Sequence, residues 1–179
     1  MKIVVITGSH HKNGTSAHLA AAFIRGAEET GHEVCRFDAA FRQVHPCIAC
    51  ETCHNTDRGC AFADDMKTLY PELLAADAVA FATPIYYYEM SGQMKTLLDR
   101  ANSLFSSDCK FRDIYFLSTA ADDGSGVDER ALHGLEGWIV CYEKCKLAGK
   151  VFAGGVNAPG SINGHSALKE AFDMGAEIE

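Results

Sequence analysis

Four of the eight cysteines in this chain of 179 residues lie within one short segment, at the spacing C-x2-C-x2-C-x6-C. They are Cys47, Cys50, Cys53 and Cys60. Three thiolates this close together, with a fourth nearby, are able to wrap one [4Fe–4S] cluster. Free or reversibly oxidised thiols are the main alternative, and zinc is less favoured because a structural zinc site usually has two well-separated cysteine pairs. The spacing predicts metal or redox chemistry and leaves these three alternatives open.

The other four cysteines are scattered along the chain. Cys141 and Cys145 are four residues apart in a segment expected to be helical, so they would share one helix face as partly buried core thiols. Cys35 and Cys109 each stand alone in the sequence, and we expect structural roles for them.

The segment 8–16, GSHHKNGTS, follows an apolar run and opens a helical pattern. Backbone N–H groups at the start of a helix favour an anion, and the hydroxyls of Ser9, Thr15 and Ser16 add donors. The segment is not a Walker A loop, because no lysine follows Gly14, and it lacks the G-x-G-x-x-G dinucleotide fingerprint. It therefore predicts a site for a monophosphate, the alternative being a polar turn with a capped helix.

Two further segments follow apolar runs in the same way. Residues 83–91 carry Pro84, Ile85 and three tyrosines, a set able to pack on a planar ring, or else to cover the sheet end or contact another subunit. Residues 118–126, STAADDGSG, are small and allow the backbone to approach a ligand closely. An EF-hand calcium loop would need alternating acids here and a glutamate where His133 stands, so calcium is excluded.

Two blocks of the sequence resemble those of a known protein family. The block 83–95, TPIYYYEMSGQMK, followed by Asp99-Arg100, together with the block 8–16, resembles the flavodoxin-like NAD(P)H-dependent FMN reductases over most of the chain. The resemblance implies bound FMN, NAD(P)H as cosubstrate, and a small electron acceptor such as free flavin or a quinone. It implies no acid–base catalytic residue, because the flavin carries the chemistry. Lys95, Asp99 and Arg100 match the family too, and we expect them to stabilise their helix.

The same resemblance assigns the cofactor contacts by position. The FMN phosphate would lie on Ser9, His11, Thr15 and Ser16, with Asn13 also in the binding set. The isoalloxazine would contact Pro84, Ile85, Tyr86 and Tyr87, with Thr119 and Ala120 near the far side of the ring. The usual family loop reads Gly-Ser-Pro-Arg-Lys-x-Gly-Asn-Thr, so His11 replaces an arginine and Thr15 an asparagine here. A neutral histidine does not supply the arginine's permanent charge, so phosphate binding is weaker or depends on pH.

The cysteine segment resembles that of the iron–sulfur flavoproteins, a branch of the same superfamily. This resemblance implies an alternative function, an electron carrier whose [4Fe–4S] cluster passes electrons from a ferredoxin-like donor to FMN. A flavodoxin-like binding protein without turnover is the third alternative. Related folds pair their subunits, so the resemblance also implies a homodimer or homotetramer.

The elements that must position these segments alternate between strand and helix. Apolar runs predict strands, and each is followed by an amphipathic pattern, with helix caps at Thr15 or Ser16 and at Asp64 or Asp65. The predicted strands are 3–7, 33–37, 78–83, 114–117 and 151–153, and one predicted helix runs from about 128 to 146. This alternation predicts one α/β domain over 1–179, a three-layer flavodoxin-like fold with a five-stranded parallel sheet of order 2-1-3-4-5. The cysteine-rich loop at 41–62 interrupts the rhythm.

Composition narrows the class of protein further. A net charge of −8 argues against a nucleic-acid binder, which normally has a basic face. A hydrophobic content of 47% with 22% charged residues excludes intrinsic disorder. The apolar runs are far shorter than the roughly 20 residues that span a bilayer, and no signal-peptide pattern follows Lys2. We therefore expect a cytoplasmic protein without membrane or nucleic-acid partners, where a disulfide framework is not expected.

Overall fold

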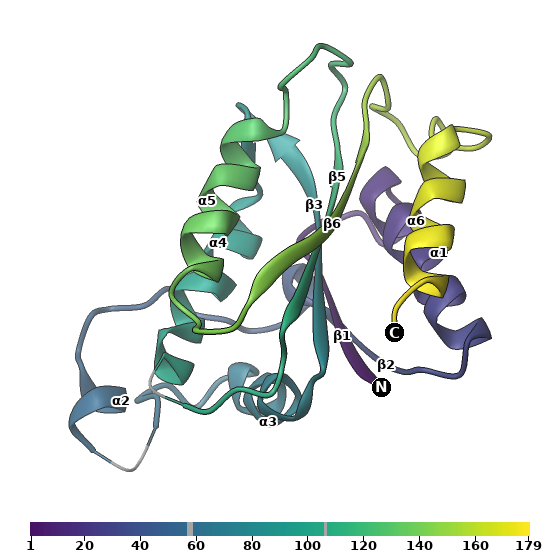
Figure 1. Ribbon diagram of the computed structural model, residues 1–179. Helices are drawn as coiled ribbons and strands as arrows, with labels where there is room; N and C mark the ends of the chain where they lie inside the picture. The colour runs from purple at the N-terminus through teal and green to yellow at the C-terminus, as the bar shows by residue number, and fades with distance from the viewer. Residues whose placement is uncertain (57–58, 106) are drawn as a thin grey trace.

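A twisted parallel sheet forms the centre of the computed structural model, which describes residues 1–56, 59–105 and 107–179 (Figure 1). The parallel strands in the described residues run in the order β2-β1-β3-β5-β6, and the two-residue β4 pairs antiparallel with β3. Their bounds are β1 Lys2–Thr7, β2 Glu33–Asp38, β3 Ala78–Tyr86, β4 Glu89–Met90, β5 Asp113–Thr119 and β6 Lys146–Ala153. The predicted order is confirmed, because β4 only shifts the numbering of the later strands.

Helices cover both faces of this sheet (Figure 1). Helices α1 and α6 pack on one face, and α3, α4 and α5 on the other, with the short α2 standing apart in the cysteine segment. Their bounds are α1 Thr15–Glu29, α2 Thr52–Asn55, α3 Met66–Ala75, α4 Gly92–Arg100, α5 Glu129–Ile139 and α6 Ser166–Ala176. Two 3-10 turns, Ala39–Phe41 and Ala101–Leu104, complete the elements of the described residues. The three predicted layers are confirmed.

The strand side chains alternate between two separate cores. Val4 and Ile6 of β1 face the layer of α3, α4 and α5, whereas Ile3 and Val5 face α1 and α6. Burial on both faces explains why these strands read as continuous apolar runs in the sequence. Helices α1 and α6 approach closely at Gly26, where an added Cβ would lie 2.0 Å from the carbonyl oxygen of Phe172. No helix among the described residues is long and apolar enough to cross a membrane.

Helix α5 is shorter than predicted. It ends at Ile139, because the chain turns there to begin β6 at Lys146, which pairs with Asp113 of β5. The prediction that Cys141 and Cys145 share a helix face is therefore wrong. The early part of β6 is a polar stretch with a register shift against β5, so its sequence lacks the apolar run that marks the other strands.

Three smaller boundary predictions are also corrected. Helix α1 begins after Gly14, which is its N-cap residue, so neither Thr15 nor Ser16 caps it. Strand β3 continues to Tyr86, so Pro84 lies within the strand and not in a turn. Strand β5 reaches Thr119. Each extension carries a predicted ligand-binding residue to the carboxyl edge of the sheet.

Candidate functional site

The carboxyl ends of β1, β3 and β5 border a cleft of about 350 Å³. This edge is where doubly wound sheets bind ligands. All the predicted cofactor-binding residues except Asn13 and Tyr87 line the cleft: Ser9, His11, Thr15, Ser16, Pro84, Ile85, Tyr86, Thr119 and Ala120. Gly14 and Ala121 line it as well. The structure thus brings residues from three distant segments to one place.

The loop between β1 and α1 forms the polar end of the cleft. The Ser9 hydroxyl accepts a hydrogen bond from the His11 backbone N–H at 3.1 Å, and the Gly14 N–H donates to the His11 carbonyl at 3.0 Å. The Thr15 and Thr119 hydroxyls lie 3.0 Å apart, which joins this loop to the end of β5. In the described chain, no side chain caps the start of α1. The first N–H groups of that helix are therefore available to a ligand, and an anion satisfies them well.

A two-residue hairpin turn follows the cleft-lining end of β3. Tyr86 pairs with Glu89 across the turn, and Tyr87 and Tyr88 occupy it with φ of 52° and 66°. Two successive positive φ values define a turn that favours Asn-Gly, so bulky tyrosines are strained there. Tyr87 is 98% exposed and stands away from the cleft, and the Arg130 guanidinium lies 5.7 Å from the ring centroid of Tyr88. Strain of this kind is characteristic of functional segments.

Sequence reasoning missed two parts of this site. Ser91 donates to the Gly8 carbonyl at 2.8 Å and its N–H donates to Thr83 at 3.0 Å, so it joins the first loop to the hairpin. An added Cβ at Gly8 would lie 2.5 Å from the Ser91 hydroxyl, which explains the glycine. The segment 156–159 after β6 also lines the cleft. Its place beyond the end of a parallel strand is the signal by which it could have been found.

A second cleft, of about 490 Å³, lies in the cysteine segment and is lined by Cys47, Cys50, Cys53 and Cys60. Residues 57 and 58 of the predicted loop 41–62 lie outside the described part. Burial raises the pKa of Cys53, and the negative charges of the other three thiolates raise it further, so the four sulfurs interact. A hydrogen bond from Thr52 lowers the pKa of Cys50.

These four thiols do not converge on a single ion. Among the residues that the structure describes, no group of three or more His, Cys, Asp or Glu side chains is arranged to hold a metal ion. A structural zinc site needs four ligands about one ion, and the described sulfurs are not gathered in that way. The four cysteines nevertheless line one cleft, and a group larger than a single ion, held by their thiolates, is a hypothesis for this cleft.

The buried Arg100 connects the cysteine segment to α4. Its guanidinium donates to both oxygens of Asp64 at 2.5 and 3.0 Å, to the His45 carbonyl at 2.8 Å and to the Cys60 sulfur at 3.2 Å. The ring of Phe62 lies 4.8 Å from the guanidinium carbon. Burial opposes the charge of Arg100, but the hydrogen bonds to Asp64, together with the negative charges of Tyr70, Cys60 and Asp64, outweigh burial and raise the pKa of Arg100. Beyond the predicted support for its helix, Arg100 therefore binds both ends of the cysteine segment.

A comparison with family models matches residues 1–142 to the model of NADPH-dependent FMN reductases. The chain belongs to this family. It is 30% identical over 161 residues to an iron–sulfur flavoprotein of Methanocaldococcus jannaschii, covering 88% of this chain and 80% of the relative. It is 26% identical to an iron–sulfur flavoprotein of Methanosarcina thermophila, over 87% of this chain and 82% of the relative.

A solved structure agrees with the fold. An NAD(P)H:quinone oxidoreductase of Methanothermobacter marburgensis superposes with a TM-score of 0.78 at 18% identity, covering 100% of this chain and 96% of that one. At this identity the likeness shows the fold alone. The family match makes the protein a flavin-dependent oxidoreductase, and FMN and NAD(P)H fit that family.

Proposed function

We propose that the protein binds FMN in the cleft at the ends of β1, β3 and β5 and reduces a quinone, free flavin or similar small acceptor with electrons from NAD(P)H. The observation that carries this proposal is the composition of the cleft. Its end at the start of α1 offers hydroxyls and backbone N–H groups, whereas its other end offers Pro84, Ile85 and Tyr86. The end at the start of α1 suits a phosphate, and the end at β3 suits a flat ring.

The chain's own residues bind and orient the cofactor. Ser9 and Ser16 are buried, so their hydroxyls are held in place before a ligand arrives. Among the cleft residues that the structure describes, His11 is the one whose side chain is able to become a cation, and no lysine or arginine lines the cleft. Phosphate binding here thus relies on backbone dipoles and hydroxyls.

When bound, FMN supplies the site that accepts hydride and passes electrons on. The residues of β3 shape the space around the ring. Ile85 and Tyr86 lie at the strand end, where Tyr86 is 53% exposed and able to cover a second planar molecule. The strained hairpin holds Tyr86 there through its pairing with Glu89. The protein positions two flat molecules against each other, and the flavin does the chemistry.

FMN binding is tested by titrating the flavin-free protein and following quenching of flavin fluorescence. Ser16→Ala removes a hydroxyl at the cleft end of α1 and should weaken binding about tenfold. Thr30→Ala is the matched control, because it removes a hydroxyl at the opposite end of the same helix, where Thr30 bonds only to backbone carbonyls. NADPH should then bleach the bound flavin, and a quinone should restore its colour. Saturable FMN binding that both variants weaken equally would contradict the proposed site.

A second candidate function is an iron–sulfur electron carrier. It is supported by the four cysteines that share one pocket, by the bond from Arg100 to Cys60, and by the names of the relatives. When bound, a [4Fe–4S] cluster would supply one-electron transfer, and a ferredoxin-like partner would be the donor. Cys47, Cys50, Cys53 and Cys60 would hold it.

Anaerobic purification separates the two candidates. Iron and sulfide are assayed on one sample, and the flavin is then exposed to NADPH alone. About four irons per chain with a flavin that NADPH does not bleach would favour the carrier. A flavin without iron that NADPH bleaches would favour the reductase. Homodimer or homotetramer formation and a cytoplasmic location stay predictions, and sedimentation of the FMN-bound protein tests the first.

A further inference from the structure

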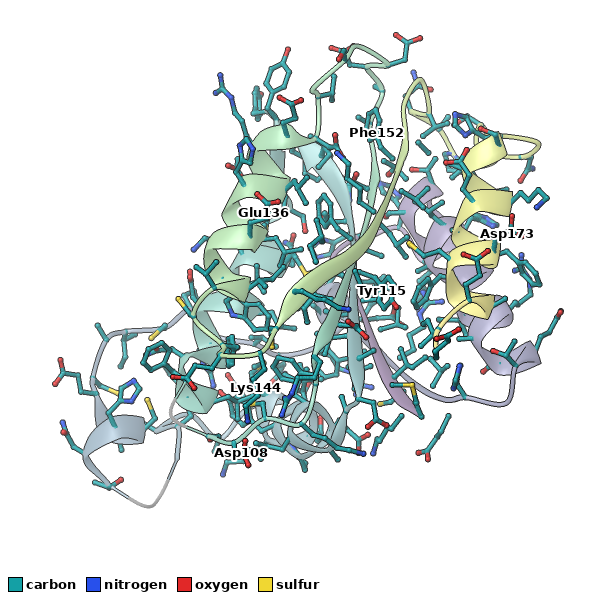
Figure 2. All side chains as sticks on the ribbon, in the orientation of Figure 1. Asp108, Tyr115, Glu136, Lys144, Phe152 and Asp173 are labelled. Carbon is teal, nitrogen blue, oxygen red and sulfur yellow. The ribbon has the colours of Figure 1, made fainter. Side chains whose placement is uncertain are left out.

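A third pocket, of about 370 Å³, lies at the opposite edge of the sheet from the FMN cleft, where β5 and β6 begin. Three cysteines line it, Cys109, Cys141 and Cys145. Two further lining residues, Asp108 and Lys144, are labelled near one another at the lower edge of the molecule in Figure 2. The sequence predicted Cys141 and Cys145 as core thiols on one helix face and Cys109 as a lone structural thiol, but folding brings all three to one pocket.

The pairing of two strands explains this juxtaposition. The Lys146 N–H donates to the Arg112 carbonyl at 2.9 Å, so the residues before β6 run beside the residues before β5. Cys145 donates from its sulfur to the Phe111 carbonyl at 3.3 Å. Cys109 lies two residues before Phe111, and its sulfur donates to the Leu104 carbonyl at 3.9 Å. The Cys145 sulfur is thus held against the backbone two residues after Cys109, and both cysteines line the same pocket.

The two thiols differ in burial and influence each other. Cys109 is 7% exposed, whereas Cys145 is half-buried. Burial, and then the negative charge of an ionised Cys145, raise the pKa of Cys109 to about 11. Burial also raises the pKa of Cys145. Cys145 is the more accessible of the two thiols, so it is the one that a molecule entering the pocket meets first.

We propose that Cys145 and Cys109 form a thiol–disulfide exchange pair that reacts with a small-molecule disulfide entering this pocket. The Cys145 thiolate attacks one sulfur of the disulfide, forming a mixed disulfide and releasing one thiolate. Cys109, after losing its proton, attacks the Cys145 sulfur, closes a Cys109–Cys145 disulfide and releases the second thiolate. Two protein thiols are oxidised and one external disulfide is reduced to two thiols, so atoms and electrons balance.

Other uses of this pocket are less well supported by the described residues. None of their side-chain groups is arranged to hold a metal ion, which argues against a thiophilic metal. Cys141 lines the same pocket but is exposed, and its sulfur donates to the carbonyl of Gly137 in its own turn. It therefore serves as a matched control for Cys145. The inference is independent of FMN, because this pocket shares no residue with the FMN cleft.

The test uses the full chain with its flavin, incubated with glutathione disulfide at mildly alkaline pH. Peptide mapping by mass spectrometry then identifies each linkage. We expect a Cys109–Cys145 crosslink that dithiothreitol removes. Cys145→Ser should abolish the crosslink, Cys109→Ser should leave a lasting glutathione adduct on Cys145, and Cys141→Ser should leave the crosslink intact.

Two results would overturn the proposal. One is oxidation of the cysteine segment 47–60 under these conditions with Cys109 and Cys145 still reduced. The other is a crosslink that joins Cys141 to either partner and disappears in Cys141→Ser. Because the mapping of the unmodified chain decides the linkage by itself, a Cys109→Ser variant that fails to fold does not remove the test.

Discussion

Replacing Asp64 by asparagine tests whether one buried ion pair secures the cysteine segment. The Asp64 and Arg100 side chains are 4% and 1% exposed. Asp64 accepts two hydrogen bonds from that guanidinium and one each from the backbone N–H groups of His45, at 3.0 Å, and Met66, at 3.2 Å. The asparagine side chain would keep one acceptor oxygen and present an amide donor in place of the other. The buried guanidinium would then lack its counter-charge.

The expected loss in free energy of unfolding follows from the burial of this ion pair. Removing one partner of a buried pair costs about 3–5 kcal/mol, because the remaining charge stays desolvated. Arg100 keeps its bonds to the His45 carbonyl and the Cys60 sulfur, so we expect the low end, about 3 kcal/mol. With a urea slope of about 2 kcal/mol per molar, the unfolding midpoint should fall by about 1.5 M.

The assay is urea unfolding followed by circular dichroism, with Asp99→Asn as the control. Asp99 pairs with Lys95 on the same helix as Arg100, but these two side chains are 49% and 60% exposed. Breaking that pair should cost at most about 0.5 kcal/mol. Alkylation of Cys60 should become faster in Asp64→Asn, because Asp64 no longer holds the Arg100 guanidinium firmly beside the Cys60 sulfur. Equal losses of stability in the two variants would refute the reasoning.

Three further predictions concern the hairpin, the phosphate loop and acid stability. His11→Arg should tighten FMN binding about tenfold, because a permanent charge adds a charge-assisted bond to the phosphate, and fluorescence titration measures it. Tyr87→Asn with Tyr88→Gly should raise the melting temperature by relieving about 1–2 kcal/mol of strain, and a calorimetric scan that shows no rise would contradict this. Burial of Asp64 opposes its ionisation, but the hydrogen bonds from Arg100 and from the backbone N–H groups of His45 and Met66, together with the Arg100 charge, outweigh burial and lower the pKa of Asp64 in the folded protein. Its stabilisation is therefore present above the ordinary carboxyl pKa of about 3.9 and is lost as the pH falls through the lowered folded value. Acid unfolding of the natural chain should accordingly be steeper than that of Asp64→Asn.

Much of the fold was predictable because its signals are local. The apolar runs of β1 and β3 are buried on both faces, so their sequences carry no polar alternation that would obscure them. The boundaries of the helices and strands were less predictable. Helix α5 stops at Ile139 because a strand must start at Lys146, and that requirement comes from pairing with β5, which no local pattern records.

The candidate FMN site was also predictable only in part. The hydroxyl-rich loop and the Pro84-Ile85-Tyr86 block were found from residue types and from their place after apolar runs. The roles of Thr83 and Ser91 were missed. Ser91 bonds to the Gly8 carbonyl and to the Thr83 hydroxyl, and no local sequence pattern indicates these two bonds. Tyr87 was expected at the ring, yet the turn geometry exposes it.

The sequence alone determined the alternation of strand and helix, the parallel sheet with its ligand-binding edge, and the residue types that meet there, since these depend on periodicity and composition. Only the tertiary structure decided which distant groups become neighbours. It placed Arg100 between His45, Cys60 and Asp64, and it brought Cys109 and Cys145 to one pocket. Such contacts depend on chain reversal and strand register. These are set by the packing of the whole domain, so no spacing of residues in the sequence indicates them.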